Sequence, residues 1–410
     1  MDIKKRLAIL NFLEFFSWGS WLLSAGAYMV ETLNFTGLQV GSVYATLGIA
    51  SIFMPPLLGI VADKFLNAEK VFGICHLLLG LLFLTLGEIT NYTTFYVLML
   101  LISICYMPTL ALNNSISYFN LENKGFDAVK TFPPIRVWGT VGFILAAWSV
   151  DALDFKVSSS QFYVGAIASF VLGLYAFTLP KVPVDNTEAR TIVQRYGLDA
   201  FKLFRNRNLA VFFIFSMLLG IALQVTNIWG VPFLNDFEMD YSDSFAVKHS
   251  VFLISLSQLS EVLFILAIPF FLKRYGIKKV VLMSMFAWML RFALFAVGYP
   301  EGIGLVFLIL SMLVYGMAFD FYFVSGSLYI NRETSPKIRS SAQGLFMMMV
   351  NGIGFMFGAY ASGIIVDFYT TEGIKDWPMI WFVFAIYAMI IGVAFAIFFR
   401  YKHKTDVELN

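Results

Sequence analysis

Residues 377–399 read WPMIWFVFAIYAMIIGVAFAIFF, a stretch without a single charged side chain. A helix needs about 20 mostly apolar residues to cross the hydrocarbon core of a bilayer. Outward from this stretch the same pattern recurs along the whole chain. The predicted spans, twelve in all, are 6–30, 38–62, 71–89, 94–119, 133–151, 160–180, 208–232, 246–272, 279–298, 303–329, 340–367 and 377–399.

The composition agrees with an all-α integral membrane protein. Apolar residues make up 59% of the 410 positions and charged residues 13%, whereas a soluble domain carries roughly twice that share of charge. The basic start, Met1 to Arg6, resembles a signal peptide, but the apolar run continues past Trp21 without a cleavage pattern. We therefore expect an uncleaved first span.

A polar, charged stretch divides the spans into two sets of six. The predicted organisation is an N-terminal bundle over 1–180, a cytoplasmic linker over 181–207, a C-terminal bundle over 208–400 and a cytoplasmic tail over 401–410. Basic tight turns at 59–71 and 273–280 occupy matching places in the two sets. This echo suggests duplicated bundles, which is the layout of alternating-access transporters.

Positive charge predicts the orientation. With the termini and even-numbered connections on one side, only Lys156, Lys248 and Lys375 of the 28 Lys and Arg residues fall on the other side, and Arg136 and Arg291 fall inside spans. Positive residues favour the cytoplasmic side. Both termini are therefore predicted to be cytoplasmic.

Ionisable groups in the middle of a membrane span are costly and usually functional. Six stand out, namely Glu14, His76, Arg136, Glu261, Arg291 and Asp320. For Arg291 a structural role is the better interpretation, and for His76 packing is favoured over proton relay. Glu14 either lines the cavity or pairs with a basic group.

Several of these groups share a helix face with amides or aromatic residues. Arg136, Thr140 and Phe143 are spaced i, i+4, i+7, and the preceding Pro133-Pro134 predicts a loosened helix start. Tyr315 and Phe319 also share a face.

Two amide-containing pairs repeat an i, i+3 spacing, Gln224 with Asn227 and Gln258 with Glu261. Asp320 lies about 100° round its helix from Phe319, so it is expected to face a neighbouring helix unless Gly316 distorts the backbone.

These residue types suit a ligand that is half sugar and half heteroaromatic base. Amides and a carboxylate supply donors and acceptors for hydroxyls and ring nitrogens, and aromatic rings stack on a planar base. A buried carboxylate near Arg136 can take up a proton reversibly. Structural roles are the alternative to ligand binding. The amide pairs could only hydrogen-bond neighbouring helices, and Arg136 could form a static ion pair.

The sequence resembles the bacterial nucleoside:proton symporters of the major facilitator superfamily, the nucleoside permease group. The likeness spans nearly the whole chain, and the loop Gly59 to Lys64 looks like a degenerate form of the superfamily's signature. The stretches that carry it are Trp18–Trp21, Gly48–Pro55, Phe132–Thr140, Phe213–Gly220, Ser257–Glu261, Arg291–Phe295 and Ala318–Phe321.

The resemblance implies a twelve-helix fold with a nucleoside site between two six-helix halves. It implies substrate-binding roles for Arg136, Thr140, Phe143, Gln224, Asn227, Gln258, Glu261, Tyr315 and Phe319. It ties Asp320 to proton coupling, and buried Glu261 is the alternative proton carrier. The implied partners are purine and pyrimidine nucleosides, protons and membrane lipid, for a monomer in the bacterial cytoplasmic (inner) membrane.

Other functions remain open on the residues alone. A sugar or other small-solute transporter would share the fold, and a nucleoside sensor would bind without transport. No nucleophile–base pair or metal-ligand cluster is apparent, and Cys75 and Cys105 lie in apolar stretches, so neither an enzyme, a cofactor nor a metal site is expected. The net charge of +2 gives no sign of nucleic-acid binding.

Overall fold

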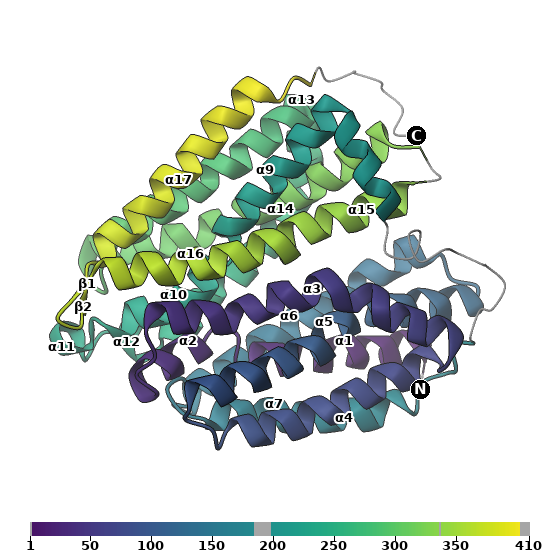
Figure 1. Cartoon of the computed structure of the whole chain (residues 1–410), viewed down its shortest axis with the longest axis horizontal. Coiled ribbons are helices and arrows are strands. Elements are labelled where there is room, and N and C mark those ends of the chain that lie inside the picture. Colours follow the sequence, from purple (N-terminus) through teal and green to yellow (C-terminus); the bar gives the residue numbers. More distant parts are fainter. Residues whose placement is uncertain (1, 184–197, 336–337, 402–410) are drawn as a thin grey trace.

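The computed structural model describes residues 2–183, 198–335 and 338–401, and these form long helices in two groups (Figure 1). The first group, drawn in purple and blue, precedes the linker. Its elements are α1 (Ile3–Gly19), α2 (Ala25–Ala27), the π-helix η1 (Tyr28–Thr32), α3 (Gly37–Lys64), α4 (Ala68–Leu86), α5 (Tyr92–Asn123), α6 (Ala128–Ala152) and α7 (Ser160–Ala176).

The second group, in teal, green and yellow, comprises residues 198–335 and 338–401 and carries the only strands in the described part of the chain. Its elements are the 3-10 helix η2 (Leu198–Arg205), α9 (Arg207–Leu223), α10 (Val225–Asn235), α11 (Glu238–Tyr241), α12 (Phe245–Lys248), α13 (Ser250–Val297), α14 (Gly302–Glu333), α15 (Arg339–Met347), the π-helix η3 (Met348–Gly354), α16 (Phe355–Phe368), the antiparallel strands β1 (Thr370–Thr371) and β2 (Ile374–Lys375), and α17 (Trp377–Phe398).

The twelve-span fold predicted from the sequence accounts for these helices. Within the described residues, eight helical stretches are long and apolar enough to cross a membrane by length and composition. One of them, α13, contains two spans because Gly276 turns the chain with φ 73°, a left-handed conformation that favours glycine. The shorter or more polar helices α1, α6 and α7 complete the set.

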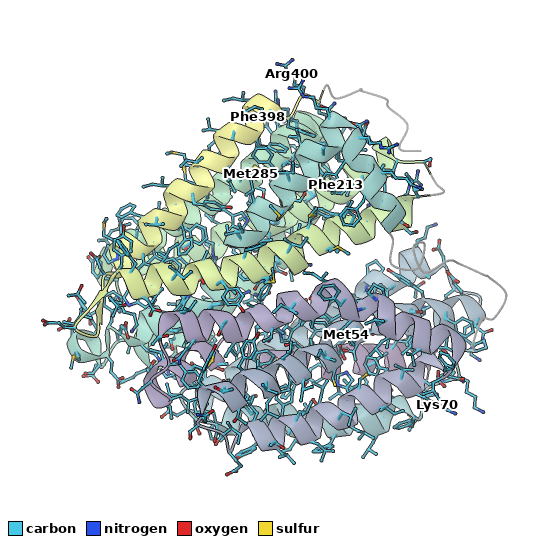
Figure 2. The ribbon with its side chains drawn as sticks, viewed as in Figure 1. Met54, Lys70, Phe213, Met285, Phe398 and Arg400 are labelled. Carbon is cyan, nitrogen blue, oxygen red and sulfur yellow. The ribbon has the colours of Figure 1, made fainter. Side chains whose placement is uncertain are left out.

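The helix surfaces suit a lipid environment. On α13, Leu263 and Leu266 are 63% and 77% exposed, which would be unfavourable over such a long surface in water. Figure 2 shows the contrast within the second group, where Met285 lies among the helices and Phe398 lies at the surface. The chain is therefore a multi-pass membrane protein.

One local prediction was wrong. Pro133 and Pro134 do not loosen the start of a helix, because α6 begins at Ala128 and carries both prolines within it. The span predicted over 208–232 is confirmed, since Arg207–Asn235 is long and apolar enough to cross a membrane. Within this span the single residue Gln224, with φ −98° and ψ −8°, separates α9 from α10.

The two groups contact each other along α3 and α16, where small residues allow close approach. A side chain at Gly41 would meet the carbonyl oxygen of Ala359 at 2.3 Å, and one at Gly363 would meet that of Gly37 at 2.2 Å. Within the second group, Gly354 and Gly358 allow a similarly close approach, because they lie against Met217 and Ile221 of α9. The domain boundaries stay predictions, since 184–197 and 402–410 lie outside the described residues.

Polar contacts between the groups gather at one end of the molecule. His249 Nδ1 lies 2.8 Å from Asp151 Oδ2, and Lys156 Nζ donates to the carbonyl oxygen of Val247 at 2.8 Å. Asp367 accepts hydrogen bonds from the first backbone N–H groups of α3 at 2.6 and 2.7 Å. Trp148 with Ser255 and Glu31 with Asn235 add side-chain hydrogen bonds between the groups in the described part of the chain.

Candidate functional site

Arg136 lies on α6 where this helix packs tightly against α1. Its guanidinium lies 3.9 Å from the ring centroid of Phe15, which is a close cation–π contact. Gly139 makes room for it, because a Cβ atom there would lie 2.6 Å from an Arg136 nitrogen. Among the described residues no carboxylate lies within 4 Å of Arg136, so the side chain is held by an aromatic face rather than by a static ion pair.

Helices α13 and α14 meet closely beside Glu261. A Cβ atom at Gly316 would lie 2.4 Å from the carbonyl oxygen of Ser260 and 2.9 Å from the backbone nitrogen of Glu261. The backbone N–H of Gly316 donates to Ser260 Oγ at 2.8 Å. Gly316 therefore does not distort α14, as considered from the sequence, but lets it approach α13.

This approach brings several predicted residues together. Tyr315 is buried and interacts with both Glu261 and Gln258. Its ring stacks on that of Phe319, with centroids 5.6 Å apart and planes inclined by 19°. Together they present a flat aromatic surface beside a carboxylate and an amide, which suits a planar ligand with polar edges.

Three charged residues from both groups interact with Glu261. Its electrostatic partners are Asp320 on α14, Arg136 on α6 and Arg291 further along α13. Asp320 is only 6% exposed, and its Oδ2 atom has no hydrogen-bond partner within the described ranges. The expectation that Asp320 faces a neighbouring helix stays a prediction, although its negative charge interacts with that of Glu261.

Arg291 is fully buried, and no carboxylate in the described part of the chain lies within 4 Å of it as an ion-pair partner. It donates to the carbonyl oxygen of Ser311 at 2.8 Å, to Thr226 Oγ1 at 3.1 Å and to Ser257 Oγ at 3.2 Å. Its guanidinium also lies 4.5 Å from the ring centroid of Tyr315. Arg291 therefore joins α10, α13 and α14 directly behind the aromatic surface.

The remaining predicted residues are linked less directly. Asn227 Nδ2 donates to Gln224 Oε1 at 2.8 Å, so the two amides bond to each other at the break between α9 and α10. Thr140 is partly exposed and Phe143 is buried, one and two turns beyond Arg136, without a recorded polar contact to the other predicted residues. The structure thus brings six of the ten predicted residues into one cluster, with Thr140 and Phe143 further along α6 and Gln224 and Asn227 at the junction of α9 and α10.

Sequence reasoning missed two features of this region. Phe15 was not considered, because its place beside Arg136 follows only from the packing of α1 against α6. His76 was left out, yet its Nε2 atom lies 2.7 Å from Glu14 Oε2, with both side chains fully buried. Of the two roles considered for Glu14, the structure favours pairing with a basic group. No group of His, Cys, Asp and Glu residues suited to a metal ion occurs in 2–183, 198–335 and 338–401.

The close approach at Gly316 predicts a large effect for a small change. Gly316→Ala should push α14 away from Glu261 and lower the free energy of unfolding by about 1–3 kcal/mol, the usual cost of overpacking. It should also weaken ligand binding, because Tyr315 and Phe319 move with the helix. Melting in detergent and ligand-binding titrations would measure both effects.

The matched control is Gly344→Ala on α15, where a Cβ atom would meet nothing within 4 Å. Alanine is favoured over glycine inside a helix, so this variant should be at least as stable as the parent. Equal stability and affinity for Gly316→Ala and Gly344→Ala would contradict the packing described here.

Comparison with known proteins shows extensive similarity over the full chain. The family model described as "Nucleoside H+ symporter" matches residues 1–404. The nucleoside permease NupG of Escherichia coli K12 is 50% identical over 406 residues, which cover 98% of this chain and 97% of that protein. The xanthosine permease of the same organism is 50% identical over 409 residues, covering 99% and 98%. These relatives are permeases, in agreement with the expectation that the chain is not an enzyme.

Solved structures show the same fold. A crystal structure of the nucleoside transporter NupG superposes with a TM-score of 0.92 at 50% identity and covers 98% of this chain and 100% of that one. A crystal structure of a peptide transporter of the POT family superposes with a TM-score of 0.74 at 13% identity, which supports the fold alone.

Proposed function

The chain belongs to the nucleoside H+ symporter family, and from this premise we propose that it imports nucleosides together with protons through the cluster around Glu261. One observation carries the proposal. Arg136 of the first group and Glu261 of the second interact across the boundary between the groups, beside the stacked rings of Tyr315 and Phe319. A ligand bound there contacts both groups, so their relative movement can expose it to either side of the membrane.

We assign the nucleoside-binding roles by chemistry. The base stacks against Phe319 and Phe143, whose rings provide the flat surfaces. The ribose hydroxyls bond to Glu261 and to the amides of Gln224, Asn227 and Gln258, which offer both donors and acceptors. Thr140 and Tyr315 supply hydroxyl groups at the edge of the site. Both purine and pyrimidine nucleosides carry the groups that this set recognises.

Asp320 is the proposed proton carrier, with Glu261 as the alternative. The Oδ2 atom of Asp320 lacks a hydrogen-bond partner within the described residues, so it can take up a proton without breaking an existing bond. Protonation also removes the repulsion between Asp320 and Glu261, which favours the state that holds nucleoside. The membrane potential contributes about 2.3 kcal/mol per proton charge per 100 mV.

The proposed setting is the bacterial inner membrane, with the protein as a monomer and both termini in the cytoplasm. In this orientation the end that carries Asp151 and His249 faces outward. We propose that an inward-facing state releases nucleoside into the cell. Proton return and closure at the cytoplasmic end would complete the cycle of alternating access.

Uptake of labelled uridine and adenosine into proteoliposomes tests this function. Uptake should exceed equilibration only when the pH outside is lower than inside, and an uncoupler should abolish the excess. Competition by sugars but not by unlabelled nucleosides would favour a sugar transporter of the same fold. Binding without any uptake would favour a nucleoside sensor.

A further inference from the structure

Glu14 and His76 form a buried acid–base pair that the proposed nucleoside and proton sites do not use. Glu14 lies on α1 and His76 on α4, and both side chains are 0% exposed. His76 Nε2 lies 2.7 Å from Glu14 Oε2, although their alignment is too poor for a regular hydrogen bond. Thr109 on α5 donates to Glu14 Oε1 at 2.8 Å. Three helices of the first group therefore converge on this pair.

The residues that surround the pair are mostly uncharged. Cys75 of α4 and Tyr106 of α5 interact with Glu14, and Cys105 of α5 lies next to Cys75. The Tyr106 hydroxyl donates to the backbone oxygen of Glu14 at 3.2 Å. Helix α7 carries no charged residue, and the charged residues of α3 occupy its last turn. The nearby fixed charge is Arg136 of α6, which interacts with both Glu14 and Glu261.

A proton fits this arrangement in both charge and geometry. A neutral histidine ring has one nitrogen that can accept a proton. His76 Nδ1 has no hydrogen-bond partner in the described residues, so a ring nitrogen is available without breaking a bond. Uptake of one proton changes the charge of the pair from −1 to 0, which removes the cost of an uncompensated buried carboxylate.

Arg136 connects this pair to the nucleoside site. When the pair holds no extra proton, the negative charge of Glu14 attracts Arg136. Glu14 then competes with Glu261 of the other group for this guanidinium. When the pair holds a proton, that attraction weakens, and Arg136 is available to Glu261 and to ligand. We propose that Glu14 and His76 form a second proton-binding site, which strengthens nucleoside binding as the pH falls; this rests on the proposed function of the Glu261 cluster.

The experiment measures uridine binding against pH in purified protein carrying Asp320→Asn, which removes the proposed main proton carrier. A fully linked proton changes affinity tenfold per pH unit. We expect affinity to rise by about threefold per unit between pH 8 and pH 6 in this background, since the linkage through Arg136 is partial. Adding His76→Gln or Glu14→Gln should reduce that slope by at least half.

Two comparisons separate proton binding from structural damage. Glu14→Gln keeps the size of the side chain, so its agreement with His76→Gln would support loss of a titratable site. Ser169→Ala removes a buried 2.7 Å hydrogen bond between α7 and Ser17 of α1 without removing an ionisable group, and should leave the slope unchanged.

An unchanged slope in both variants, or an equal loss in Ser169→Ala, would overturn the second site. Failure of the parent protein to bind uridine at all would instead contradict the proposed function. Proton uptake on uridine binding, measured by calorimetry in buffers of different ionisation enthalpy, should fall in the same two variants and provides an independent readout.

Discussion

Asp320→Asn should abolish accumulation of nucleoside driven by a pH gradient while leaving exchange of nucleoside across the membrane largely intact. The amide resembles the protonated carboxyl group in size and charge, but it cannot release a proton. A one-to-one symporter accumulates its substrate about tenfold per unit of pH difference, because one pH unit corresponds to about 1.4 kcal/mol. We therefore expect the variant to equilibrate uridine without concentrating it.

The measurement is labelled uridine uptake into proteoliposomes, paired with counterflow, which requires no net proton movement. Asp243→Asn is the matched control, because Asp243 is 97% exposed in its side chain and lies outside the spans. It should accumulate uridine like the parent. If the Asp320→Asn variant still accumulated uridine fully when driven by the pH gradient, Asp320 would be excluded as the coupling group. Glu261 would then be the favoured proton carrier.

Arg136→Lys should weaken nucleoside binding strongly although it keeps the positive charge. The ammonium group cannot reproduce the planar contact of the guanidinium with Phe15, and it offers fewer donors in a fixed direction. Hydrogen bonds to charged groups contribute about 1.5–3 kcal/mol, so the affinity for uridine should fall by roughly tenfold to a hundredfold or more. Equilibrium binding in detergent measures this directly.

Arg274→Lys provides the control for the same chemical change. Arg274 is exposed and lies in the turn between two spans, where its guanidinium is 5.6 Å from the ring centroid of Tyr275. Its replacement should leave uridine affinity unaltered. If Arg136→Lys bound uridine as tightly as Arg274→Lys, Arg136 would not belong to the binding site.

Local sequence patterns were enough to predict the spans and the helix faces. Each span is set by the length of apolar chain needed to cross the bilayer, and this property belongs to consecutive residues. The spacing of Gln258 and Glu261 likewise follows from the helical repeat alone. These features did not depend on which helix packs against which.

Contacts between helices could not be predicted in this way. The contact of Arg136 with Phe15 is one example, since the two residues lie on different helices, α6 and α1. The partner of Glu14 is another, because His76 is 62 positions away in the sequence and meets it only through the packing of α1 against α4 and α5. Nothing in the sequence around either residue indicates that the two form a pair.

The sequence by itself determined that this protein spans the membrane repeatedly and carries amides, aromatic rings and charges within its spans. Tertiary structure decided which of those groups meet. Gly316 brings α14 against Glu261, and Gly139 leaves space for Arg136 over Phe15. The physical reason is that hydropathy acts along one helix, whereas the close approach of two helices depends on small residues and shapes on both.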